Sequence, residues 1–137
     1  MAARTKLALV VATTVVCAAV FGGAAVAHNK RFSNSVSLVE AKRLSPAIGT
    51  YGGRVTSGKP RCRRHREVQI WRADVTPEVR VVTGHTGPGG KYRRKGPALP
   101  DGAKVYALIE TKVLLGNAAH NHTCPVDRSP VRTIPYP

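Results

Sequence analysis

The sequence predicts an all-β protein folded as a single antiparallel β-sandwich of about six to seven strands. Short segments in which apolar and polar residues alternate recur along the chain, as expected for half-buried strands. Clusters of Gly, Pro and Asp separate these segments roughly every ten residues, and no segment after residue 27 shows a convincing helical period. We therefore expect one β-sandwich domain over residues 51–134, followed by a short tail at residues 135–137.

The first 27 residues have the pattern of a secretory signal peptide. Arg4 and Lys6 precede an apolar run over residues 7–21, and the segment ends with Ala25-Val26-Ala27. We expect cleavage after Ala27, secretion, and no membrane span in the mature chain of about 110 residues, a length that suits one domain. A retained anchor is the alternative, because the apolar run approaches the roughly 20 residues that cross a bilayer.

The cysteines predict one disulfide bond. Cys17 leaves with the signal peptide, so only Cys62 and Cys124 remain, and an oxidising compartment favours their pairing. The bond would close a loop of about 60 residues and stabilise the fold by roughly 4 kcal/mol. Two free thiols or an intermolecular bridge are the alternatives.

The chain is strongly basic. It has 22 Lys and Arg against seven Asp and Glu, and loss of the signal peptide leaves a net charge of about +13. Such a field attracts anionic cell-wall polymers, lipid headgroups or extracellular nucleic acid. A GC-rich genome, however, produces a similar excess of Arg, Ala, Gly and Pro without any anionic ligand.

The strands follow in order along the chain. Residues 28–50 form a basic leader, disordered at its start, in which Ser35–Leu38 is a candidate edge strand. Tyr51–Ser57 and Arg66–Arg72 alternate well and are expected to form the hairpin around which the sheet is built, with a break at Gly58-Lys59-Pro60. Further strands are expected at Val79–Thr83, around Tyr92 after a hairpin turn at residues 85–90, at Ala103–Leu115 and at Val131–Ile134.

The stretch Ala103–Leu115 is apolar on both faces, which predicts a central strand covered on both sides. A helix is the competing interpretation, but β-branched and aromatic residues favour the strand. The Gly-rich stretch at residues 85–90 is not a phosphate-binding loop, because no Gly-Lys-Ser/Thr helix start follows it.

Two basic clusters are the candidate anion-binding residues. Arginine side chains can hold phosphate in a forked geometry, but no nearby aromatic residues could stack bases. For the first cluster, the alternative is a solvated loop. For the second, it is an edge strand whose charges prevent aggregation. The clusters consist of Arg61, Arg63, Arg64 and Arg66, and of Lys91, Arg93, Arg94 and Lys95.

The histidines raise two further hypotheses. If the segment is a strand, the side chains of His120, His122 and Cys124 project on the same side, and their types are ligands for zinc or copper. A disulfide at Cys124 would remove that ligand, so we expect no metal and no cofactor. A small basic hydrolase such as a ribonuclease would need a histidine near a second titratable group. Its candidate residues are His65, His85, His120 and His122 with Glu67 or Glu110.

Several of these motifs resemble a known family. Tyr51-x-Gly53-x-Val55-x-Ser57, Cys62, Arg66-x-Val68-x-Ile70, the segment TGPGGKY at residues 86–92, Val105-Tyr106-Ala107 and Cys124 are similar to small secreted actinobacterial proteins of the transthyretin-like or carboxypeptidase-regulatory-like type. The likeness covers residues 51–124.

The resemblance implies a prealbumin-like sandwich and no catalytic site, because such modules serve as extracellular spacers, adhesion units or carbohydrate-associated domains. Related collagen-adhesin domains carry a Lys–Asn isopeptide bond, where this chain has only the candidate disulfide. We therefore expect a secreted, non-enzymatic domain that associates with anionic polymers. The hydrolase and a rigid protein-docking module are the alternatives.

Overall fold

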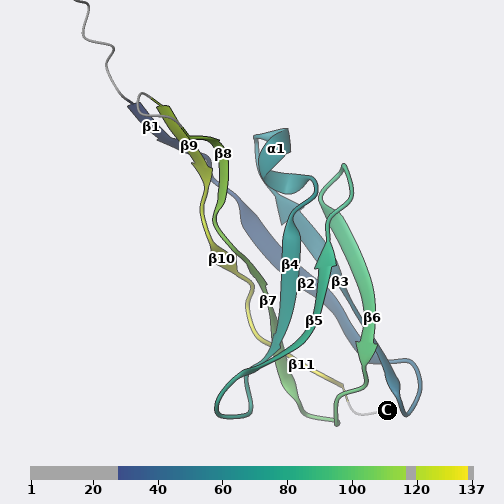
Figure 1. Ribbon diagram of the computed structural model, residues 1–137. Helices are drawn as coiled ribbons and strands as arrows, with labels where there is room; N and C mark the ends of the chain where they lie inside the picture. The colour runs from purple at the N-terminus through teal and green to yellow at the C-terminus, as the bar shows by residue number, and fades with distance from the viewer. Residues whose placement is uncertain (1–27, 117–119, 136–137) are drawn as a thin grey trace, which may run out of the picture.

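The computed structural model describes residues 28–116 and 120–135, which form a mostly β structure with one short helix (Figure 1). The all-β prediction is confirmed. The predicted signal peptide and the last two residues of the tail lie outside the described residues. The strands are β1 (His28–Arg31), β2 (Ser35–Arg43), β3 (Ile48–Thr56), β4 (Glu67–Arg72), β5 (Val79–His85), β6 (Lys91–Pro97), β7 (Lys104–Ile109), β8 (Lys112–Gly116), β9 (His120–Cys124), β10 (Asp127–Arg128) and β11 (Arg132–Thr133), and the helix is α1 (Pro60–Arg63).

The strands form three sheets. One has the order β2-β3-β6, and a second has the order β10-β7-β4-β5, with β11 also paired to β7. The third has the order β1-β9-β8 and projects from one end of the body that the other two sheets form (Figure 1). All described pairs are antiparallel except β1 with β9.

One core lies between the first two sheets, because alternate residues of their strands point inward. Tyr51 and Val55 of β3 are buried while Arg54 and Thr56 are exposed, as the two-residue period predicts. The second sheet contributes buried side chains to the same core, namely Val68, Ile70, Val105, Ala107 and Ile109.

The predicted central hairpin is wrong. β3 pairs with β2 and β6, whereas β4 pairs with β5 and β7, so the two strands lie in different sheets. The chain crosses between the sheets through α1, a one-turn helix that the sequence does not predict, which has Pro60 in its first turn. Alternation predicts that a segment is a strand, but it does not say which sheet the strand joins.

The predicted hairpin turn at residues 85–90 is wrong for a similar reason, since β5 and β6 are not paired with each other. Gly90 has φ +82°, and a Cβ there would lie 2.2 Å from the carbonyl oxygen of Val55. The backbone therefore passes close to β3 as it changes sheets, which only glycine permits.

Two other segments differ from their prediction. The start of the leader, expected to be disordered, forms β1, which pairs in parallel with β9 so that His28 is opposite His120. The single strand expected at Ala103–Leu115 is divided into β7 and β8, which belong to different sheets. Glu110 and Thr111, exposed and polar, separate the two strands.

The predicted disulfide bond is confirmed. Cys62 of α1 and Cys124 at the end of β9 are bonded, with an S–S distance of 2.07 Å, and both residues are fully buried. The bond therefore joins the third sheet to the connection between the first two. Within the described residues, no helix is long and apolar enough to cross a membrane.

Candidate basic surface and other sites

The first candidate basic cluster is divided between the interior and the surface. Arg66 is only 2% exposed, and its guanidinium donates hydrogen bonds to the carbonyl oxygens of Cys62, at 3.1 Å, and Glu110. Burial lowers the pKa of this guanidinium. Arg66 thus holds α1 against the link between β7 and β8 and is not part of an exposed surface.

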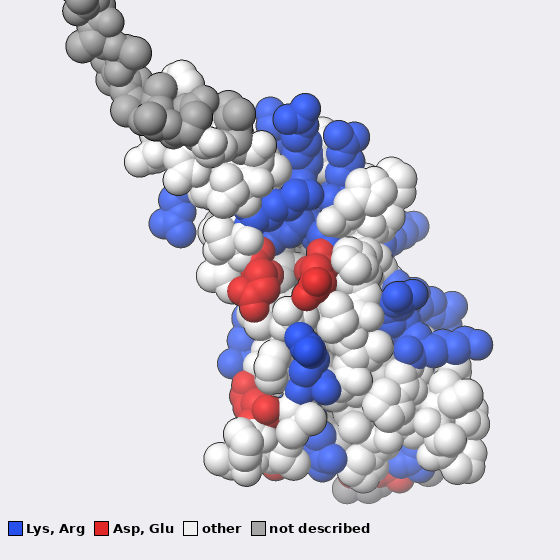
Figure 2. Space-filling view, viewed as in Figure 1, with Lys and Arg blue, Asp and Glu red and all other residues white. Residues whose placement is uncertain are grey.

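The other three arginines of this cluster are more accessible. Arg61 and Arg64 are exposed, while Arg63 is partly buried and donates to the carbonyl oxygen of Ser57 at 3.0 Å. Figure 2 shows Lys and Arg side chains gathered over α1 at the top of the molecule and beside β6 at the right-hand edge, with uncharged residues between the two groups and acidic side chains below the upper one. The basic residues therefore do not form a single continuous patch in this view.

The second candidate cluster lies on β6 and is also divided. Lys91, Arg93 and Lys95 alternate along the strand and point to its outer face. Arg94 points to the opposite side, where its methylene groups cover Gly84 of β5, so that a Cβ at Gly84 would lie 2.3 Å from Arg94 Cγ. Three of the four predicted residues thus share one face.

The strand register adds two cations that the sequence analysis did not single out. Lys95 lies in one row with Thr50 and Lys42, and Lys91 lies in one row with Arg54 and Ser37. Glu40, Gly52 and Arg93 form the row between. We define the basic face as the outer face of the β2-β3-β6 sheet, whose cations are Lys42, Arg54, Lys91, Arg93 and Lys95.

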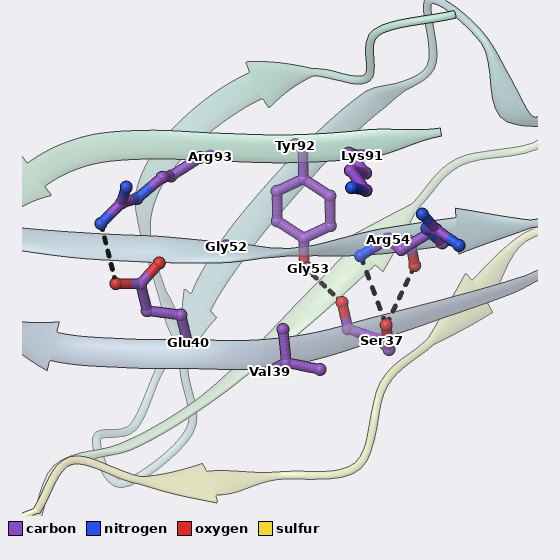
Figure 3. A pocket seen from close by; sticks show the side chains of 9 residues that line it. All are labelled: Ser37, Val39, Glu40, Gly52, Gly53, Arg54, Lys91, Tyr92 and Arg93. Atoms are coloured by element: carbon purple, nitrogen blue, oxygen red, sulfur yellow. Dashed lines mark hydrogen bonds and ion pairs between the residues drawn. The ribbon is translucent and has the colours of Figure 1, made fainter. Parts of the chain in front are cut away.

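A shallow depression of about 590 Å³ lies on the basic face (Figure 3). Its floor includes Gly52 and Gly53, which have no side chains to fill it, and Arg54, Lys91 and Arg93 are among the residues around it. The depression exists because Gly52 leaves a gap in the middle row of outward side chains, between Glu40 and Arg93.

Tyr92 lies between Lys91 and Arg93 in the sequence, and its buried side chain belongs to the core on the inner side of the sheet, beneath this depression. Its hydroxyl donates a 2.6 Å hydrogen bond to the carbonyl oxygen of Ser37, so the side chain spans from β6 across β3 to β2 (Figure 3). A Cβ at Gly53 would lie 1.9 Å from that carbonyl oxygen and 2.7 Å from the Tyr92 hydroxyl. Burial raises the pKa of Tyr92, so the phenol stays neutral.

Glu40 is the acidic residue of the basic face. Its Oε1 lies 3.0 Å from Arg93 Nη2 and 3.2 Å from Lys42 Nζ. Desolvation acts to raise the pKa of Glu40, but the hydrogen bonds and charges of Lys42 and Arg93 hold it below its usual value. Among the described residues, no ion pair involves Arg54, Lys91 or Lys95.

The hydrolase candidates converge only in part. His65, Glu67 and Glu110 line one depression of about 340 Å³, together with Arg66 and Lys112. In the part of the chain that the structure describes, no hydrogen bond joins His65 to either carboxylate. A fourth candidate, His85, lies opposite Glu67 in the β4–β5 pair but does not line this depression.

The remaining candidates, His120 and His122, lie on β9 in the third sheet and do not line this depression. Their neighbour is His28, which the sequence analysis did not consider. Cys124 is bonded to Cys62, and the described residues contain no group of three or more His, Cys, Asp or Glu side chains placed to hold a metal ion.

No protein-family model, curated protein or solved structure matches this chain. The resemblance to transthyretin-like and carboxypeptidase-regulatory-like domains therefore stays a prediction.

Proposed function

We propose that the chain is a secreted, non-enzymatic domain that binds an anionic polymer of the cell envelope through the basic face. In this proposal, the signal peptide is cleaved after Ala27, and the two facing sheets are a sandwich of the prealbumin-like type. The observation that carries the proposal is the set of five cations that three strands place on one sheet face, three of which line a glycine-floored depression.

The arrangement of these cations favours a polymer over a small anion. Lys91, Arg93 and Lys95 alternate along one strand, so their Cα atoms are about 7 Å apart. A row of this kind can contact successive charges of an extended polyanion. The depression is open and shallow, whereas sites for small ligands enclose most of the ligand surface.

Charge balance on the face supports the same conclusion. Glu40 compensates Arg93 and Lys42, which leaves Arg54, Lys91 and Lys95 without an acidic partner among the described residues. Exposed cations that form no ion pairs contribute little to folding stability, but they raise the local concentration of a polyanion and speed its association.

A triple variant tests the proposal. Arg54→Gln, Lys91→Gln and Lys95→Gln together should weaken retention on purified wall polymer by at least about tenfold at low salt, because screened electrostatic contacts provide the attraction. The matched control is Arg31→Gln, Arg80→Gln and Lys104→Gln, which removes the same charge from exposed positions elsewhere. Equal losses in the two variants would show that net charge, and not this face, is responsible.

One observation favours a second candidate, the small basic hydrolase. His65 shares its depression with Glu67, Glu110 and Lys112, which could supply general acid–base groups beside a cation for phosphate. Purified protein would then cleave RNA, His65→Ala would abolish cleavage, and His120→Ala would leave it unchanged. Absence of cleavage by the pure protein dismisses this candidate.

A further inference from the structure

Three imidazoles meet at the junction of β1 and β9. His28 Nδ1 lies 3.0 Å from His120 Nδ1, and His28 Nε2 lies 3.3 Å from His122 Nε2. The ring centroids of His28 and His120 are 4.4 Å apart. This cluster forms because parallel pairing of β1 with β9 places His28 directly opposite His120, although the two residues are far apart in the sequence.

His28 has a second property that only processing of the chain would reveal. It follows Ala25-Val26-Ala27, the predicted cleavage site of the signal peptide. Cleavage there makes His28 the first residue and turns its backbone nitrogen into a free amine. The amine and Nδ1 of the same histidine can close a six-membered ring on a metal ion, whatever the surrounding structure.

We propose that the mature chain binds one copper(II) ion through the α-amine and Nδ1 of His28 and Nδ1 of His120. The proposal rests on the export that the proposed function includes, and it is independent of the basic face. It names a metal site in a part of the molecule that polymer binding does not use.

The distance between the two imidazole nitrogens fits a shared metal ion. Ligand nitrogens lie about 2.0 Å from such ions, so two of them are about 2.8 Å apart in a square-planar site and about 3.3 Å apart in a tetrahedral one. The 3.0 Å between His28 Nδ1 and His120 Nδ1 lies between these values. The separation of the two nitrogens therefore suits a shared ion.

The donor set selects copper. Imidazole and amine nitrogens suit divalent ions late in the first transition series, and copper(II) binds such sites more tightly than nickel or zinc. The site uses two imidazoles and one main-chain nitrogen, so it needs no third ligand side chain.

His122 has a supporting role in this arrangement. It contacts the other nitrogen of His28, Nε2, and so can fix the orientation of the His28 ring without binding the ion itself.

The experiment uses the mature protein recovered after secretion with its own signal peptide. Intact mass identifies the first residue, isothermal titration with copper(II) gives stoichiometry and affinity, and electron paramagnetic resonance reports nitrogen ligands. We expect one copper per chain. Loss of a ligand in His28→Ala or His120→Ala should weaken binding by at least about tenfold, and His122→Ala should weaken it less.

The decisive control inserts Ser-Pro-Ser-Pro between Ala27 and His28. It keeps all three imidazoles but moves the amine away, and its prolines lack amide protons that copper could displace. This variant should also bind at least about tenfold more weakly. Equal binding by this variant or by His120→Ala overturns the proposal, as does a mass showing that His28 is not the first residue. Polymer retention, measured on the same samples, should not change, so the two proposals fail separately.

Discussion

The strongest test of the basic face is a substitution that should improve binding. Glu40→Gln replaces the carboxylate with a neutral group of similar shape. It releases Arg93 and Lys42 from their ion pairs, which the structure places at 3.0 and 3.2 Å. The number of basic-face cations without an acidic partner then rises from three to five.

The expected change in the salt dependence of binding follows from the number of released cations. For a single-stranded polyphosphate, each cation that contacts a phosphate adds about 0.7 to the slope of log K against log salt concentration. Three contacts predict a slope near 2 and five predict a slope near 3.5, by the same estimate of about 0.7 per contact. Because exposed ion pairs contribute at most about 1 kcal/mol each, we expect affinity at low salt to rise several-fold.

The assay is fluorescence anisotropy with labelled oligothymidylate of about 20 nucleotides, between about 50 and 200 mM salt. Glu78→Gln is the control, because Glu78 pairs with Arg128 in another part of the molecule and its loss raises the net charge by the same amount. An unchanged slope in Glu40→Gln, or an equal rise in the control, would refute the assignment of binding to the basic face.

Three further predictions concern the fold that supports these surfaces. Replacing Cys62 and Cys124 together with alanine should lower the free energy of unfolding by about 4 kcal/mol in urea titrations, because the bond closes a loop with a sequence separation of 62 residues. An arginine neighbour lowers the pKa of Asp74, so the ionised carboxyl stabilises the fold above about pH 4 and this stabilisation is lost as pH falls. Asp74→Asn should therefore lower the free energy of unfolding by at most about 1 kcal/mol at pH 7. Measured as a function of pH, the free energy of unfolding of this variant should fall less below about pH 4 than that of the original chain. Gly53→Ala should lower the thermal midpoint strongly, whereas Gly58→Ala, with no atom within 4 Å of the new Cβ, should not.

The sequence predicted the local features of this fold better than its pairing. Alternation identified the inward positions of β3 and β4, and the cysteine count identified the disulfide bond. The sheet to which each strand belongs was not predictable, because it depends on contacts between distant residues. The crossing at Gly90, for example, depends on the close approach of its backbone to Val55, which no local pattern encodes.

The candidate surfaces were predictable to different degrees. Lys91, Arg93 and Lys95 were identified as a cluster, but their partners Arg54 and Lys42 are isolated in the sequence and join them only through strand register. Arg66 belonged to the densest run of cations, yet its guanidinium is buried against two carbonyl oxygens. Charge density in sequence therefore does not separate surface cations from structural ones.

His28 illustrates a signal that was present but not used. A histidine directly after a predicted cleavage site is a candidate chelating residue from chemistry alone, and only the pairing of β1 with β9 supplies the second imidazole. The two proposed sites are held in place by different features of the fold. Cys124 ends β9 and is bonded to Cys62 of α1, so a covalent bond holds the β1-β9-β8 sheet to the rest of the fold. The basic face depends instead on the register of β2, β3 and β6. A chain of this size with one modest core can in this way carry two binding surfaces whose geometries do not depend on each other.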